Sequence, residues 1–307
     1  MMVTEAGSTE AGARRAGFVA LLGAPNAGKS TLLNRLVGAK ISIVTPKAQT
    51  TRTRVLGIAL HGQTQLIFID TPGIFEAKKR FDRAMVAAAW AGAASADIVA
   101  VLVDASRPVG DDTRRLLSGL KDQSIKAVLV LNKIDLVARN KLLVLADELN
   151  REGIFTDIFM VSAATGDGVD DLIEHFAARL PLGPWLYPED QLSDMPQALL
   201  AAEVTREQLF LQLRQELPYA ATVEPESWKA LADGGVRIDQ VIYVERDSHK
   251  PIVLGKGGLR IKAIGTASRR ELEQMFGHPV HLFLHVKVRG WSEKPEHYRA
   301  LGLDFDA

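Results

Sequence analysis

The sequence contains no cysteine, and its charges of opposite sign cancel. The absence of cysteine excludes a disulfide framework, a thiolate zinc site and a thiol nucleophile, and it fits a cytoplasmic protein. Lys and Arg total 37, and so do Asp and Glu, so any surface for nucleic acid must be a local patch. The stretch nearest to a membrane span, 84–96, ends at Asp97 before about 18 apolar residues accumulate. Residues 1–16 have no apolar core, so we expect a flexible tail there and not a signal peptide.

The chain of 307 residues exceeds the size of most single cores and predicts two domains. Short apolar runs alternate with helical patterns through residue 181, which is typical of an α/β fold with a mixed, mostly parallel sheet and helices on both faces. The expected strands are 18–22, 55–60, 66–69, 98–103, 127–131 and 158–161, the second and third forming a hairpin. The expected helices are 29–37, 79–94, 111–123, 139–151 and 169–180. This first domain covers residues 17–181.

A connection rich in proline, 182–200, separates the first domain from a smaller unit. The order of elements changes beyond it, which predicts an α+β domain over 201–290 and a C-terminal tail over 291–307. Its expected elements are a helix at 202–216, strands at 221–229 and 236–246, a glycine loop, helices at 259–265 and 268–276, and a strand at 280–288.

A phosphate-binding loop lies directly after the first expected strand and opens the first expected helix. It matches the pattern GxxxxGK[ST]. In such a loop backbone N–H groups surround the β-phosphate, Lys29 pairs with the β- and γ-phosphate oxygens, and Ser30 ligates Mg²⁺. Asn26 offers a side-chain oxygen beside the phosphates, where some related GTPases hold K⁺. The candidate residues are Gly23, Ala24, Pro25, Asn26, Ala27, Gly28, Lys29 and Ser30.

The third expected strand ends in Asp70-Thr71-Pro72-Gly73. The Asp70 carboxylate can hold the Mg²⁺ shell through water, and the Gly73 N–H can meet the γ-phosphate. Ile74 stands where Ras-type GTPases carry the glutamine that orients the attacking water. Because isoleucine cannot do this, we expect slow intrinsic hydrolysis.

The segment Gln49-Thr50-Thr51-Arg52 lies between these two motifs and has little helical or strand pattern. A threonine here would complete the Mg²⁺ shell only when the γ-phosphate is present, which would make the loop a switch. We favour Thr51 over Thr50, although the sequence does not separate them.

A base-recognition motif follows the strand expected at 127–131. Its Asp135 carboxylate can accept hydrogen bonds from N1–H and the 2-amino group of guanine, two donors that adenine lacks. Asn132 would support the base edge, the aliphatic stem of Lys133 would cover the ring, and the Ala163 N–H would reach guanine O6. The candidate residues are Asn132, Lys133, Ile134 and Asp135, with Ser162, Ala163 and Ala164 after the next strand.

The glycine loop of the second domain, Gly255-Lys256-Gly257-Gly258, fits the GxxG loop that clamps about four nucleotides of single-stranded RNA in KH domains. Residues 246–270 hold seven basic side chains and one acid, a local charge of +6 in a chain of net charge zero. Such a cluster is the electrostatic pattern expected for binding phosphates. The candidate RNA-binding residues are Gly255, Lys256, Gly257, Gly258, Arg260, Lys262, Arg269 and Arg270.

These motifs, with VKVRGW near the end, closely resemble the Era family of bacterial GTPases over nearly the whole chain. The resemblance implies a P-loop GTPase domain followed by a type II KH domain. It also implies a role in assembly of the small ribosomal subunit, with the KH domain on the 3′ region of its RNA. Some members associate peripherally with the inner membrane. The residues expected to act in GTP hydrolysis are Lys29, Thr51, Asp70 and Gly73.

We therefore expect a monomeric, Mg²⁺-dependent GTPase that binds ribosomal RNA. The main alternative is a membrane-associated signalling GTPase whose KH fold serves protein contacts. Two further alternatives are an RNA-binding module with a purely structural nucleotide domain and an enzyme that uses ATP.

Overall fold

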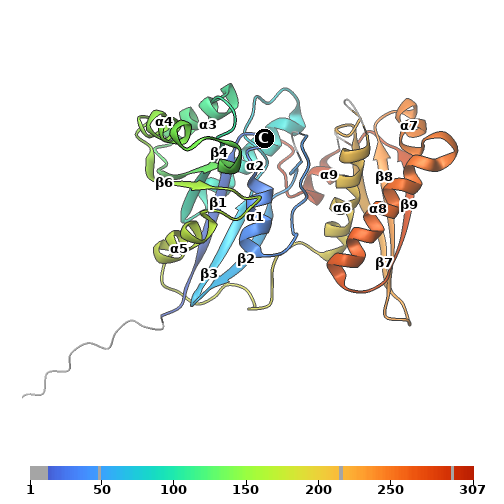
Figure 1. Ribbon diagram of the computed structural model, residues 1–307. Helices are drawn as coiled ribbons and strands as arrows, with labels where there is room; N and C mark the ends of the chain where they lie inside the picture. The colour runs from blue at the N-terminus through green and yellow to red at the C-terminus, as the bar shows by residue number, and fades with distance from the viewer. Residues whose placement is uncertain (1–12, 48–49, 214–216, 292–293) are drawn as a thin grey trace, which may run out of the picture.

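The computed structural model describes residues 13–47, 50–213, 217–291 and 294–307, which form two domains (Figure 1). Within this part of the chain no helix is long and apolar enough to cross a membrane. Residues 1–12 of the expected N-terminal tail lie outside the described residues, and Gln49 does as well. The first domain begins at Arg15, two residues before the expected boundary.

The first domain contains a six-stranded sheet in the order β2-β3-β1-β4-β5-β6. β2 and β3 are antiparallel neighbours, and all other neighbours are parallel. This confirms the mixed, mostly parallel sheet and the hairpin. The strands are β1 (Arg15–Gly23), β2 (Val55–His61), β3 (Thr64–Asp70), β4 (Ile98–Asp104), β5 (Ala127–Asn132) and β6 (Phe155–Val161).

Helices cover both faces of this sheet. One core joins it to α1 (Lys29–Val37) and α5 (Val169–Arg179). A second core joins the opposite face to α2 (Arg80–Ala94), α3 (Asp111–Asp122) and α4 (Arg139–Asn150). Because β1, β3 and β5 run parallel, their carboxyl ends meet at one edge, where open α/β sheets bind ligands. That edge holds the P-loop, Asp70 and Asn132.

The second domain packs a three-stranded sheet against two long helices, with the short helix α7 between them in the chain. The sheet order is β7-β8-β9, with β7 and β8 antiparallel and β8 and β9 parallel. Buried apolar side chains join the sheet to α6 and α8. The elements are α6 (Gln197–Gln212), β7 (Ala221–Ala230), β8 (Val236–Val244), α7 (Lys250–Leu254), α8 (Leu259–Phe276) and β9 (Val280–Val288).

One expectation for this domain was wrong, and one element was missed. The helices expected at 259–265 and 268–276 are one helix, α8, because Gly265 packs close to Leu284 without ending the helix and Ser268 Oγ bonds back to the Ile264 carbonyl. The five-residue helix α7, which precedes the GxxG loop, was not expected. The expected end of α6 falls partly on residues 214–216, outside the described chain.

The connection at 182–200 is packed along the first domain. Ile58 N–H donates to the Leu192 carbonyl, and Trp185 and Tyr187 contact the core beside β2 and β3. α6 starts inside this range, at Gln197, so the second domain begins earlier than expected.

The C-terminal residues, expected to be a tail, return to the first domain and form α9 (Pro295–Ala300). Trp291 and Tyr298 are buried against Phe81 and Met85 of α2. Figure 1 accordingly places the C-terminus beside α2, across the junction between the domains. The two domains therefore share a core in addition to the connection.

Candidate nucleotide site and RNA-binding loop

The P-loop joins β1 to α1 and surrounds the Lys29 side chain. Lys29 Nζ donates to the carbonyl oxygens of Gly23 and Ala24, at 3.0 and 3.2 Å. Burial lowers the pKa of Lys29 to about 8, and the charge of Asp70 opposes this shift. Among the described residues, Lys29 Nζ makes hydrogen bonds only to carbonyl oxygens, and a buried ammonium group in that state is suited to receive a phosphate.

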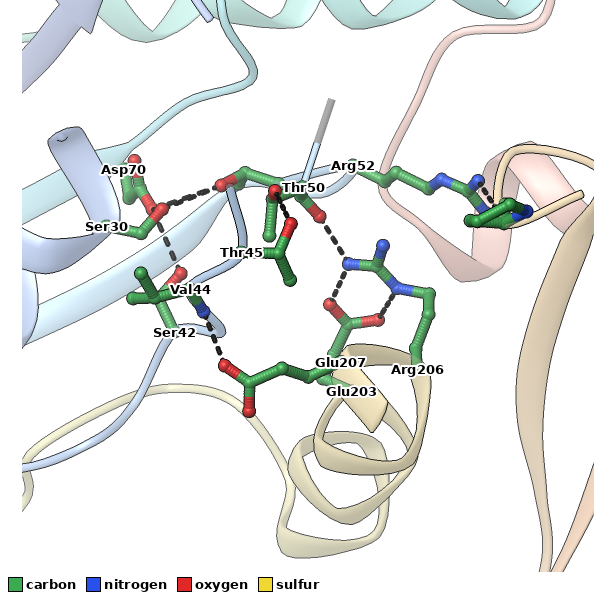
Figure 2. A network of polar contacts seen from close by, with 12 residues as sticks. Ser30, Ser42, Val44, Thr45, Thr50, Arg52, Asp70, Glu203, Arg206 and Glu207 are labelled. Atoms are coloured by element: carbon green, nitrogen blue, oxygen red, sulfur yellow. Dashed lines mark hydrogen bonds and ion pairs between the residues drawn. The ribbon is translucent and has the colours of Figure 1, made fainter. Parts of the chain in front are cut away.

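Side-chain oxygens gather around Asp70 at the end of β3. Ser30 Oγ lies 2.7 Å from Asp70 Oδ2 and 2.8 Å from Thr51 Oγ1. Thr51 Oγ1 is 3.4 Å from Asp70 Oδ2, and Ser42 Oγ is 3.0 Å from it. Figure 2 shows Ser30, Ser42 and Asp70 pointing toward one another. The structure thus brings together the three residues expected at the metal and adds Ser42.

The oxygens around Asp70 fit Mg²⁺, which prefers oxygen ligands and usually keeps several waters. Asp70 is fully buried, and its Oδ1 has no hydrogen-bond partner among the described residues. Burial raises the pKa of Asp70, while Lys29 and the three hydroxyl groups oppose the rise. An unpaired buried carboxylate oxygen is costly unless it meets a cation or a hydrogen-bond donor.

The hydroxyl groups of Thr50 and Thr51 have different partners. Thr50 Oγ1 is turned away from Asp70 and bonds to Thr45 Oγ1 and the Lys47 carbonyl. The geometry therefore favours Thr51, the residue that we preferred although the sequence did not separate the two. Ile43–Thr45 and Thr50–Thr51 line the same pocket as the P-loop.

The rest of the β3 motif packs against the P-loop. Thr71 is buried and donates to the Leu21 carbonyl, while Pro72 is also buried. A Cβ on Gly73 would lie 2.9 Å from Pro25 N, so the close approach of the two loops requires glycine. Ile74 N–H donates to the Gly23 carbonyl, and its side chain lies in the core. The Ile74 side chain is therefore buried and does not line the pocket beside the P-loop.

The base-recognition motif reaches the P-loop through Asn132 and Lys133. Asn132 Nδ2 donates to the Ala27 carbonyl at 2.8 Å. Lys133 Nζ donates to the Asn26 carbonyl at 2.9 Å and pairs with Asp104 Oδ2 at 2.6 Å. Asn26 and Lys133 have φ of 64° and 67°, two of the three positive values among described residues other than glycine. Strained residues in contact are typical of a functional site.

Asp135 lies on a single 3₁₀ turn, Ile134–Leu136, directly after Lys133. Its Oδ1 accepts a 2.6 Å hydrogen bond from Ser162 Oγ, which orients the carboxylate. The Ala163 N–H donates to Asn132 Oδ1 at 3.0 Å and is therefore already engaged within the protein. The Ala163 and Ala164 carbonyls accept from the guanidinium of Arg35, a residue that the sequence did not single out.

The GxxG loop lies between α7 and α8 in the second domain. Gly255 has φ 72° and ψ 172°, a conformation confined to glycine, and Gly257 and Gly258 also have positive φ. Of the expected basic residues, Lys256, Lys262, Arg269 and Arg270 are exposed. Arg260 is half-buried, and its guanidinium donates to the Ile252 carbonyl. This hydrogen bond links α8 to α7 across the GxxG loop.

Sequence reasoning missed the residues that join the switch loop, here residues 40–47 and 50–52, to the second domain. Arg206 donates to the Thr50 carbonyl, and Glu207 accepts from the Val44 N–H. The Arg52 guanidinium donates to the carbonyls of Pro218, Tyr219 and Ala221. The available signal was a pair of adjacent charged residues, Arg206 and Glu207, among the mostly apolar residues that α6 buries.

This fold and site define a class of protein: a GTPase domain joined to a KH domain. A family model described as 50S ribosome-binding GTPase matches residues 18–133, and one described as KH domain matches residues 216–292. Together they span both halves of the fold.

Curated relatives identify the family. The chain is 58% identical to GTPase Era of Sinorhizobium medicae over 95% of this chain and 94% of the relative. It is 57% identical to GTPase Era of Agrobacterium fabrum over 95% and 92%. The chain belongs to the Era family of GTPases.

Solved structures agree over the whole fold. A single-residue variant of Aquifex aeolicus Era bound to GDP·AlF₄⁻ is 39% identical with a TM-score of 0.88, covering 94% of this chain and 99% of that one. A structure of Era in complex with MgGDPNP and nucleotides 1506–1542 of 16S ribosomal RNA is 38% identical with a TM-score of 0.89, with the same coverage. Magnesium is thus supported as the cofactor of this GTPase.

Proposed function

We propose that this chain is a GTP-hydrolysing switch that binds the 3′ region of small-subunit ribosomal RNA and assists small-subunit assembly. The observation that carries the proposal is the presence of a guanine-nucleotide site and a basic GxxG loop in one chain, with the switch loop contacting both domains. The solved relative that holds MgGDPNP together with 16S ribosomal RNA supports it.

At the phosphates, we assign the P-loop N–H groups to the β-phosphate and Lys29 to the β- and γ-phosphate oxygens. Ser30 and Thr51 would hold Mg²⁺ directly, and Asp70 would hold it through water. The metal supplies charge that stabilises the transferring phosphoryl group. Gly73 N–H would bind the γ-phosphate. Because Ile74 lies in the core, another group must orient the attacking water, and we expect slow intrinsic hydrolysis.

At the base, the Asp135 carboxylate would accept from guanine N1–H and the 2-amino group. Its bond from Ser162 holds it in one orientation, and Asn132 ties the motif to the P-loop. Adenine would leave the carboxylate without these donors, a mismatch that can cost a factor of about 10⁴–10⁵ in discrimination.

At the RNA, glycine at the ends of the Gly255–Gly258 loop would let phosphates approach the main chain. The exposed Lys256, Lys262, Arg269 and Arg270 would supply the charge, and each neutralised phosphate adds to the salt dependence of binding.

Asn26 is the proposed contact for a K⁺ ion beside the phosphates. Its Nδ2 donates to the Pro46 carbonyl of the switch loop at 3.2 Å, which ties that loop to the P-loop. Replacing KCl by NaCl should then slow hydrolysis and leave GDP affinity unchanged. Equal rates in both salts would leave Mg²⁺ as the one proposed metal.

The testing experiment measures binding of a 3′-end RNA fragment with GDP and with a non-hydrolysable GTP analogue. We expect tighter binding with the analogue, a steep decrease as salt rises, and loss of binding when Lys256 is replaced by glutamate. ATP should not compete for the nucleotide site. RNA binding that is weak and insensitive to salt would favour the alternative of a membrane-associated signalling GTPase. Equal RNA affinity with GDP and with the GTP analogue would show that the bound nucleotide does not control RNA binding.

We further propose that the protein is monomeric and works in the cytoplasm, with peripheral association at the inner membrane. Fractionation of cells into soluble and membrane fractions tests the association. Sedimentation at micromolar concentration tests the monomer.

A further inference from the structure

Helix α6 of the second domain holds the segment of the first domain that carries Thr51. Arg206 Nη2 donates to the Thr50 carbonyl, and Glu207 Oε1 accepts from the Val44 N–H at 2.7 Å (Figure 2). Glu207 also pairs with Lys40, which in turn pairs with Glu271 of α8. Within this switch segment, described over residues 40–47 and 50–52, the second domain therefore holds Lys40, Val44 and Thr50.

The Thr50 carbonyl group is bonded directly to the Thr51 nitrogen. Both belong to one planar peptide unit, so fixing that oxygen restricts where the Thr51 side chain can point. In this arrangement Thr51 Oγ1 lies 2.8 Å from Ser30 Oγ, beside Asp70. The Arg206 contact thus acts on the peptide unit next to the hydroxyl group assigned to Mg²⁺.

Burial of the charged Arg206 side chain is energetically unfavourable compared with burial of an apolar residue. Arg206 is 1% exposed, and its ion-pair partner is Glu203 on the same helix, three residues earlier. Burying such a pair costs more than burying apolar side chains of similar volume. Of its hydrogen bonds among the described residues, the one to Thr50 reaches the first domain. The contact of Arg206 with the Thr50 carbonyl is the best explanation for burying a charge at this position.

We propose that Arg206 is a positioning residue for the nucleotide site: from the second domain it fixes the Thr50 carbonyl and holds the Thr51 hydroxyl beside Ser30 and Asp70. The inference rests on the proposed function, because it takes Thr51 as the residue that senses Mg²⁺ and γ-phosphate. It adds that the site is incomplete without the second domain.

The test compares two nucleotides in Arg206→Met. Affinity for a non-hydrolysable GTP analogue with Mg²⁺ should fall about 10- to 100-fold, the usual effect of losing a residue that orients a metal ligand. The Mg²⁺ concentration for half-maximal hydrolysis should rise in parallel. GDP affinity should stay within about twofold of the wild type, because GDP lacks the γ-phosphate that recruits the switch.

Lys47→Met provides the matched control. Lys47 Nζ bonds the Phe210 and Leu213 carbonyls, so this variant also removes contacts between the switch segment and α6, but away from the Thr50–Thr51 peptide. It should leave both nucleotide affinities unchanged. If Lys47→Met and Arg206→Met were equally impaired, the role of Arg206 would be general docking and the inference would be wrong.

A double-variant cycle tests the route of the effect. If Arg206 acts through Thr51, Thr51→Ala with Arg206→Met should hydrolyse GTP no more slowly than Thr51→Ala alone. Multiplicative losses would overturn the inference. Where Arg206→Met does not fold, Arg206→Lys is measured in the same way, since lysine keeps the charge but cannot bridge Glu203 and Thr50 with a planar fork.

The wild type separates failure of this inference from failure of the proposed function. A wild type that binds the GTP analogue without Mg²⁺, or ATP as well as GTP, would contradict the proposed function. A normal wild type with a normal Arg206→Met would contradict the inference alone.

Discussion

Raising the pH from 7.5 to 8.5 should weaken GDP binding, because it neutralises Lys29 in the free protein. Burial places the Lys29 pKa at about 8. Bound phosphates add the opposite charge that the site lacks and should return the pKa toward its ordinary value of 10.5. GDP binding should therefore take up about 0.25 proton at pH 7.5 and about 0.75 proton at pH 8.5, and the affinity should fall about threefold between them.

Calorimetry in two buffers of different ionisation enthalpy measures this proton uptake directly. The titrations are made with Mg²⁺ chelated, so that no metal ligand contributes. Proton uptake near zero at both pH values would mean that Lys29 is already charged in the free protein, and the argument from burial would be refuted.

The stability of the nucleotide-free protein gives an independent check of the Lys29 pKa. It should rise with pH, whereas GDP affinity should fall. The folded pKa lies below the unfolded one, so between pH 8 and 10.5 the unfolded chain binds more protons and folding gains with rising pH. The gain for Lys29 is up to about 3 kcal/mol at about 1.4 kcal/mol per pH unit. The free energy of unfolding of Lys29→Met should lack this rise, and parallel curves for the two proteins would contradict the shift.

Three substitutions test other parts of the fold. In Gly28→Ala the new Cβ would lie 2.2 Å from Asn132 Nδ2 at a φ of 99°, so GDP affinity should fall about tenfold or more, and an unchanged titration would contradict the packing of the two motifs. Trp291→Ala should cost about 3–5 kcal/mol in urea unfolding, whereas a loss below about 1 kcal/mol would mean that the C-terminal segment is not docked. In Gly255→Ala the Cβ would lie 2.9 Å from Arg260 N, so RNA affinity should fall about tenfold with GDP binding intact; undiminished RNA binding would exclude this loop as the clamp.

The nucleotide motifs were predictable because each consists of neighbouring residues in the sequence. Their place in the fold follows from the rule that ligands bind at the carboxyl ends of parallel strands. The P-loop, Asp70 and Asn132 each follow a buried apolar run, and the carboxyl ends of parallel strands share an edge. The sequence could therefore place them together before any contact was known. The same reasoning placed the GxxG loop before a helix, although it missed α7, which is only five residues long.

The missed features depend on contacts between distant segments. Ser42 joins the oxygens around Asp70 from a stretch with no motif of its own. The break expected after Gly265 is absent from α8, where glycine has low helix propensity but packs against Leu284. The docking of residues 291–307 did leave a signal, since Trp291, Tyr298 and Phe305 are a high aromatic content for a solvated tail.

The contacts at the domain junction limit how the two ligands can influence each other. α8 begins at the GxxG loop and carries Glu271, which pairs with Lys40 at the start of the switch segment. If GTP favours the arrangement in which α6 holds Thr50, it tightens RNA only by the difference in RNA affinity between the two arrangements. The same coupling free energy must then act in reverse, so RNA must tighten the GTP analogue by the same factor. In Arg206→Met both factors should fall together toward one. If both factors instead kept their wild-type values, the two sites would be coupled by a route other than Arg206.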